Sequence, residues 1–291
     1  MPLGVVFRPQ FPPEQLRAVA RAADEAGLEQ LWLWEDCFGE SAISAAAAAL
    51  AWTERVPVSI GLLPVPLRNV ALTAMEIATL ARLFPGRVEV GIGHGVQAWM
   101  GQVGARAASP LTLLGEHLAA LRALLSGERV TTEGRYVKLD GVRLDWPPER
   151  PPPLLAGATG PRTLDLVATL ADGTILTGGT SPEGVRAASE RLGAARAAAG
   201  LPGPHPVIAY LMTATGAGAA ERIAAEVAEW KLDPAGDVAV AGDAKAIAAA
   251  VHRMNEAGAS TVVLQPTPDE PDLEGFVRFV AEEVQPLVSG S

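Results

Sequence analysis

The chain has 291 residues, a net charge of −10, one cysteine and four histidines. Its length suits one large α/β domain, and its acidic balance argues against a nucleic-acid partner, although helix N-termini hold phosphate even in acidic proteins. One cysteine excludes an internal disulfide, and the histidines lack the i, i+4 spacing of a zinc-binding helix, so we expect no metal site.

The N-terminal sequence MPLGVVFRPQ lacks the basic start and long apolar run of a signal peptide. No later stretch is long and uncharged enough to be a membrane helix. We therefore expect a cytoplasmic protein that contacts neither membrane nor nucleic acid.

A recurring unit follows along the chain, in which a helical stretch stops at a glycine and passes into a short β-rich run. The glycines are Gly27, Gly173 and Gly258, and Pro85-Gly86 acts in the same way. This unit is half of a βαβ motif. The strands expected are Leu3–Phe7, Gln30–Trp34, Val58–Leu62, Val88–Ile92, Leu154–Ala156, Thr174–Leu176, Val207–Ala214 and Thr261–Leu264. The helices expected are Pro13–Ala26, Ala42–Thr53, Ala71–Phe84, Leu111–Leu125, Pro161–Leu170, Pro182–Ala199, Ala244–Ala257 and Leu273–Leu287.

Eight strands spread evenly between helices predict an α/β fold of the (β/α)8 TIM-barrel type, with residues 1–291 as one domain. An open doubly wound sheet is the alternative. The polar, β-rich segment 127–153 interrupts the pattern and ends in prolines. We predict that it is a small hairpin inserted after the fourth helix.

The carboxyl ends of the barrel strands are where such folds carry their chemistry. Glu35 and Asp36 follow the second strand and are candidate catalytic residues. Because neighbouring residues in a strand point to opposite faces, only one of these carboxylates can face the barrel mouth directly. Gly61, in the third strand, indicates a bulge or a close approach by another group.

The fourth strand ends in Gly91, Gly93 and Gly95, with His94 between the last two. This spacing is not a dinucleotide-binding fingerprint. Three absent side chains would let a flat ligand approach the backbone there, and His94 would stand at the mouth beside it.

Two glycine- and threonine-rich turns precede predicted helices on neighbouring strands. The first turn comprises Gly157, Ala158, Thr159 and Gly160, and the second comprises Thr177, Gly178, Gly179 and Thr180. Backbone amides at a helix N-terminus attract anions, so we predict that the pair binds a phosphate group.

The chain resembles the luciferase-like monooxygenases, a family of (β/α)8 barrels that use reduced flavin or the deazaflavin coenzyme F420. The resemblance spans nearly the whole chain. Its most specific segments are LWLWEDCF, GLLPVPLRN, FPGRVEVGIGHGV, SPLTLLGEHLAALRALLSGE and GATGPRTLDLVATLADGTILTGGTSPE.

The resemblance implies a role for each matching residue. Glu35 takes the place of a carboxylate near the reactive edge of the ring, and Asp36 stands where a catalytic histidine is usual. The Gly61–Leu62 bond matches a non-prolyl cis peptide that supports the ring. His94 is the remaining candidate acid, because Val96 replaces a glutamate found in some members.

The two turns, Gly157–Gly160 and Thr177–Thr180, match the family segments that hold the phosphate-bearing tail. The resulting hypothesis is an oxidoreductase that transfers hydride between coenzyme F420 and a small organic substrate. The alternatives are an FMN-dependent monooxygenase, a barrel that binds the cofactor without turnover, and a phosphosugar-type enzyme. Barrels of this type commonly pair through helices, so a homodimer is also expected.

The sequence does not define the substrate, but it supplies candidates to line the pocket. These are Phe7, Arg8, Phe11, Phe38, Trp99 and Met100. We take Cys37 to be structural.

Overall fold

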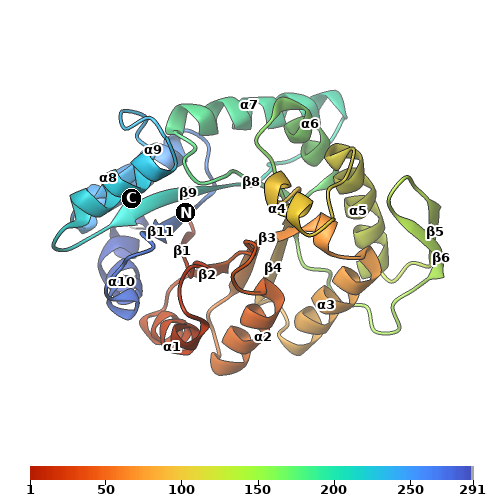
Figure 1. Cartoon of the computed structure of the whole chain (residues 1–291), viewed down its shortest axis with the longest axis horizontal. Coiled ribbons are helices and arrows are strands. Elements are labelled where there is room, and N and C mark those ends of the chain that lie inside the picture. Colours follow the sequence, from red (N-terminus) through yellow and green to blue (C-terminus); the bar gives the residue numbers. More distant parts are fainter. Residues whose placement is uncertain (290–291) are drawn as a thin grey trace.

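A computed structural model describes residues 1–289 as a closed parallel barrel surrounded by helices (Figure 1). The barrel strands, in order around the ring, are β1 (Leu3–Val6), β2 (Gln30–Leu33), β3 (Val58–Pro64), β4 (Val88–Gly93), β7 (Leu154–Gly157), β8 (Gly173–Ile175), β9 (Val207–Ala214) and β11 (Thr261–Pro266). The ring closes because β11 pairs with both β9 and β1. The predicted TIM barrel is therefore confirmed, and the open sheet is not formed.

The helices cover the outside of the ring. They are η1 (Pro13–Gln15), α1 (Leu16–Ala26), α2 (Ala42–Trp52), η2 (Val65–Leu67), α3 (Val70–Leu83), α4 (Gln97–Gln102), α5 (Pro110–Leu125), α6 (Pro161–Leu170), α7 (Pro182–Ala198), α8 (Ala219–Glu229), α9 (Ala244–Glu256), α10 (Leu273–Phe279), η3 (Val280–Val284) and α11 (Gln285–Ser289). The helix predicted at Leu273–Leu287 is thus divided by a π-helical turn, η3.

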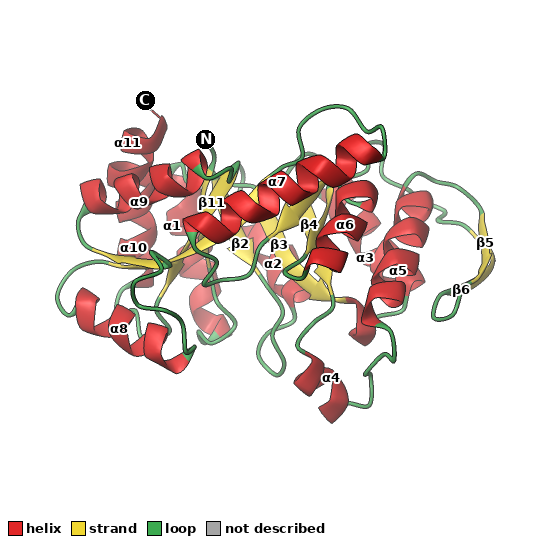
Figure 2. Ribbon diagram, turned by 90° about the horizontal axis from the view of Figure 1, so that it is seen from above, coloured by secondary structure: helices red, strands yellow, loops and turns green. Residues whose placement is uncertain are grey.

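Four elements were not predicted: η2, α4, α8 and the short strand β10 (Ala239–Ala241), which pairs with β9 outside the ring. The α8 sequence has the apolar periodicity of a surface helix, but it is mostly alanine and glutamate, with only Ile223 and Val227 as larger apolar residues. Figure 2 shows α4 and α8 projecting from the same side of the barrel. Since α4 directly follows β4, this side carries the carboxyl ends of the strands.

The insertion contains an antiparallel hairpin, β5 (Val130–Glu133) and β6 (Lys138–Val142), as predicted. The carboxylate of Glu116, on α5, fixes its turn. It accepts hydrogen bonds from the amides of Arg135, Tyr136 and Val137 at 2.9, 2.8 and 3.0 Å. A charge-assisted group of three bonds therefore attaches the hairpin to the helix.

The core has two layers. A large layer lies between strands and helices, and a smaller cluster fills the barrel and contains Val6, Trp32, Leu155, Ile175, Ile208, Tyr210 and Val263. Gly4 makes room for this filling, because a Cβ at Gly4 would lie 2.6 Å from the Trp32 ring. Glycine and a large aromatic residue on paired strands thus let a narrow barrel pack without voids.

Candidate active site

The adjacent carboxylates after β2 point in different directions, as strand geometry requires. Glu35 turns outward. Both of its oxygens accept hydrogen bonds from the Arg68 guanidinium, with Nη2 2.9 Å from Oε2, and Oε2 also accepts from the first amide of α2, at Ala42. Arg68 also pairs with Glu76 on α3. This arrangement makes Glu35 a brace between strand and helices and disfavours its predicted place beside the reactive ring.

Asp36 lies instead against the aromatic residues at the top of the barrel. Its Oδ2 accepts a hydrogen bond from Trp34 Nε1 at 2.8 Å, and the Trp34 ring contacts Tyr210 edge-on at a centroid distance of 5.5 Å. Burial raises the pKa of Asp36, and this rise is limited by the Trp34 and Gln10 side chains and by the positive charge of Arg8. A carboxyl group in this position binds its proton more tightly than an exposed aspartate.

Strand β3 is irregular where Gly61 predicted a bulge. Its pairing with β4 shifts register between Ile60 and Leu63, and the Gly61–Leu62 peptide bond is cis, as the family resemblance implies. The Tyr210 hydroxyl, buried inside the barrel, donates a hydrogen bond of 2.8 Å to the Gly61 carbonyl. The bulge is therefore supported from below by a side chain of β9.

The strand-tip glycines do not leave bare backbone, which corrects the expectation drawn from the sequence. A Cβ at Gly93 or Gly157 would overlap the side chain of Leu62, and a Cβ at Gly91 would overlap Ile175. The missing side chains make room for Leu62 to lie across the tips of β4 and β7. A flat ligand at this place would rest on an apolar Leu62 side chain rather than on glycine backbone.

The first predicted turn, Gly157–Gly160, leads directly into α6, with Gly160 as the residue before the helix. A Cβ at Gly160 would have nothing within 4 Å, so the first turn of α6 faces open space. His94 joins this end of the helix, because its Nε2 lies 3.3 Å from the Thr163 hydroxyl. Burial lowers the pKa of His94, an effect partly offset by the Pro110 carbonyl, so the imidazole is neutral near pH 7.

The second predicted turn, Thr177–Thr180, precedes α7 on the neighbouring strand. The amide and hydroxyl of Thr180 both donate to the Thr177 carbonyl, at 3.3 and 2.7 Å, so they stabilise the turn itself. Gly179 has a φ of +82°, and its Cα packs close to Leu232, so it is partly covered. The structure thus brings both turns to one edge of the barrel.

The predicted substrate residues separate into buried and exposed ones. Phe7 and Phe11 pack on each other at 5.5 Å within the hydrophobic core, and Met100 is fully buried beneath Gly95. This placement favours packing over contact with a substrate. Trp99 is half-buried, and Phe38 is 70% exposed on the loop after β2.

A buried ionic cluster at the mouth was not predicted. Arg8 donates to Glu226 at 2.7 Å and to the Pro266 carbonyl at 2.8 Å, and both ionic side chains are 2% exposed. Gln265 also donates to Glu226, at 3.2 Å, and its oxygen faces Gly178. The cluster ties α8 to the ends of β1 and β11. The local sequence signal for this cluster was a charged residue, Arg8, directly after a predicted buried strand.

Tyr210 and Glu40 were also missed. Tyr210 is the one polar ring in an otherwise apolar strand, and a buried hydroxyl of that kind usually has a partner. Glu40 lies on the loop after β2, and burial, together with the nearby Glu14 carboxylate, raises its pKa to about 7. Its Oε1 is buried without a hydrogen-bond partner among the described residues.

Within residues 1–289, no group of three histidine, cysteine, aspartate or glutamate side chains is placed to hold a metal ion. In the same residues, no helix has the length and apolar character that crossing a membrane requires.

The fold and the site define a (β/α)8 barrel whose strand ends carry two turns that lead into helices, an apolar Leu62 side chain and a desolvated carboxyl group. A model of the luciferase-like monooxygenase family matches residues 1–270. The chain belongs to this family.

Individual relatives are similar over part of the chain. It is 29% identical over 176 residues to the 5,10-methylenetetrahydromethanopterin reductase of Methanolobus tindarius, and the aligned region covers 60% of this chain and 54% of the relative. It is 32% identical over 187 residues to the F420-dependent hydroxymycolic acid dehydrogenase of Mycobacterium tuberculosis, and the aligned region covers 60% of this chain and 52% of the relative. The chain thus spans about half the length of the curated relatives it matches.

Among solved structures, an F420-dependent secondary alcohol dehydrogenase in complex with an F420-acetone adduct superimposes with a TM-score of 0.85. The two chains are 21% identical, and the match covers 99% of this chain and 98% of the other. This likeness establishes that the whole fold is shared.

Proposed function

We propose that the protein is an F420-dependent oxidoreductase that transfers hydride between coenzyme F420 and a small organic substrate. The observation that carries this proposal is the arrangement of the open α6 turn, the Leu62 platform and Asp36 along one edge of the barrel. Membership of the luciferase-like family and similarity to F420-dependent relatives support it.

The residues at this edge fit a long planar cofactor with an anionic tail. The amides of Thr159, Gly160 and Arg162 would hold a phosphate, because Pro161 has no N–H and the amides of Ala158 and Thr163 already donate to the Ile175 and Gly160 carbonyls. The Thr177–Thr180 turn would add contacts from the next strand. Leu62 would support the ring. When bound, the deazaflavin supplies a carbon atom that gives or accepts hydride.

The chain's own task in such a reaction is to move a proton. A carbonyl that receives hydride at carbon must receive a proton at oxygen, and the reverse reaction must remove it. The carboxyl group of Asp36 is desolvated and anchored by Trp34, so it would hold that proton in a fixed position. His94 lies beside α6 and would contact the cofactor rather than replace Asp36.

Titration of the purified protein with coenzyme F420 and with FMN tests the proposal. We expect micromolar binding of F420 and weaker binding of FMN. Preferred binding of FMN would favour the monooxygenase alternative, and binding of F420 without turnover of any alcohol or carbonyl compound would favour a non-catalytic carrier. Millimolar or weaker binding of both would contradict the proposal.

The homodimer and the cytoplasmic location belong to this proposal as well. Exposed apolar side chains on α3 support the homodimer. Cell fractionation tests the location.

A further inference from the structure

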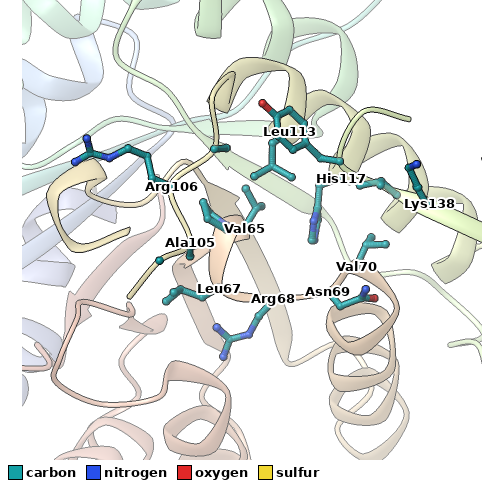
Figure 3. Close-up of a pocket in the computed structure, with 15 residues that line it drawn as sticks. Val65, Leu67, Arg68, Asn69, Val70, Ala105, Arg106, Leu113, His117 and Lys138 are labelled. Atoms are coloured by element: carbon teal, nitrogen blue, oxygen red, sulfur yellow. The ribbon is translucent and has the colours of Figure 1, made fainter. Parts of the chain in front are cut away.

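A pocket of about 590 Å³ lies outside the proposed cofactor site (Figure 3). Its floor is the segment Val65–Val70, its wall is the loop Gly104–Ala107 with α5, and the hairpin residues Tyr136–Lys138 cover it. None of the residues assigned to the cofactor lines it. The volume is within the range of sites that bind small organic molecules.

The pocket contains a buried imidazole that lacks a partner. His117 projects from α5 into the pocket (Figure 3), and the residue is 1% exposed. Its Nε2 is buried and has no hydrogen-bond partner among the described residues. Burial lowers the pKa of His117 to about 4, so the ring is neutral at pH 7. An unsatisfied buried nitrogen is costly, and a ligand atom at that point would remove the cost.

The polarity of the lining selects the kind of ligand. The lining contains Arg68, Arg106 and Lys138 but no acidic residue, although the chain has 33 aspartates and glutamates. The charge of Arg68 is matched by Glu35 and Glu76. Arg106 bonds only to the neutral Gln97 carbonyl, and Lys138 lies 3.8 Å from Glu133 in an exposed pair. Arg106 is therefore the lining cation without a carboxylate partner among the described residues, and no carboxylate in the lining repels an anion.

The interior is apolar by contrast. Val65, Val70, Leu113 and Val137 all contribute to the lining, and Leu113 points inward beside His117 (Figure 3). A suitable ligand thus has a compact hydrocarbon body and one anionic end.

We propose that this pocket is a second small-molecule site, which binds an organic carboxylate with an apolar ring or branched body. The carboxylate accepts a hydrogen bond from His117 Nε2 inside a lining without acidic residues, while the hydrocarbon body contacts the valine and leucine side chains. The site is separate from the proposed redox site and does not depend on that function.

Isothermal titration calorimetry of the full chain with sodium benzoate, benzamide and sodium acetate tests the site. We expect benzoate to bind in the millimolar range or tighter, and at least about tenfold more tightly than either comparison compound, since each lacks one of the two required features. Equal binding of benzoate and benzamide would overturn the proposal. So would the absence of binding at millimolar benzoate in 20-fold excess over the protein.

Three variants locate the binding. His117→Leu should weaken benzoate at least about fivefold, the effect of one net hydrogen bond, and Ala107→Trp should abolish binding by filling the pocket. Lys138→Met should weaken binding, whereas Lys245→Met, on the exposed face of α9, should not. If benzoate binds Ala107→Trp and Lys138→Met as tightly as the unmodified chain, the ligand occupies another place and the proposal is wrong.

Discussion

Glu35 and Asp36 are neighbours in the chain, but their surroundings give them different chemistry. Glu35 is fully paired with a guanidinium and a helix amide, whereas Asp36 lies among rings and has an elevated pKa. The Asp36 carboxyl group, whose pKa burial raises, holds a proton more readily than an exposed aspartate. At the scale of the single residue, this difference in environment is why we propose Asp36, and not Glu35, as the proton-transferring carboxylate.

Replacing Asp36 by asparagine removes the proton-transferring group and keeps the shape of the side chain. We expect Asp36→Asn to lower kcat about 10²–10⁴-fold, with little change in the Kd for F420. Stopped-flow measurement of hydride transfer and a fluorescence titration of F420 check the two parts.

Glu35→Gln is the matched control for this prediction. It should keep most of the kcat but lower the free energy of unfolding by about 1–3 kcal/mol, because the Arg68 guanidinium loses a carboxylate partner in a partly buried site. If Glu35→Gln reduced kcat as strongly as Asp36→Asn, Glu35 would be the reactive carboxylate and our assignment would be wrong.

The irregular end of β3 shows how one element shapes the site. The bulge places Leu62 across the tips of β4 and β7, and glycine at positions 93 and 157 is what permits this. The platform of the proposed site is therefore made by packing between three strands, and it depends on the absence of two Cβ atoms.

Adding one of those atoms tests the platform. Gly157→Ala should lower the free energy of unfolding by about 1–3 kcal/mol, because the new methyl group overlaps Leu62. Urea denaturation measures the change. The control Gly160→Ala should change stability by less than about 0.5 kcal/mol, because its Cβ meets open space.

The double variant Leu62→Ala/Gly157→Ala sharpens this test. The second methyl group should cost less in the Leu62→Ala background than in the native chain, since the overlapping side chain is gone. Simple additivity of the two changes would show that Leu62 does not fill the space above Gly157.

At the scale of the whole molecule, the fold leaves an apolar face of α3 uncovered. Leu72, Met75 and Leu83 lie on one face of α3 and are 48%, 58% and 65% exposed. Their spacing of three and eight residues keeps them on one side of the helix. A row of exposed large apolar side chains is typical of a protein interface, which favours the expected homodimer.

Light scattering after size-exclusion chromatography tests this assembly. We expect the chain to elute as a dimer at micromolar concentration and Met75→Glu to shift it to monomer, because a carboxylate at the centre of an apolar interface loses its hydration. The control Val103→Glu, at an exposed valine outside α3, should leave the dimer intact. A native chain that elutes as a monomer would contradict the prediction.

Local patterns in the sequence were sufficient for the barrel. A glycine that ends a helix, such as Gly27 with its φ of +73°, and a β-rich run beyond it act over a few residues. Four such units, together with four further β-rich runs, predict eight strands. The same local reading identified the turns at Gly157–Gly160 and Thr177–Thr180 and the bulge at Gly61. It missed α8, whose apolar positions are mostly alanine.

Only the tertiary structure decided which of these residues act together. Arg8 and Glu226 are 218 positions apart, and the Tyr210 hydroxyl reaches the Gly61 carbonyl across 149. The direction of Asp36, the position of Leu62 and the pocket around His117 likewise depend on strands and loops that meet only when the barrel closes. Sequence patterns encode local conformation, whereas contacts between distant residues are set by strand register and packing.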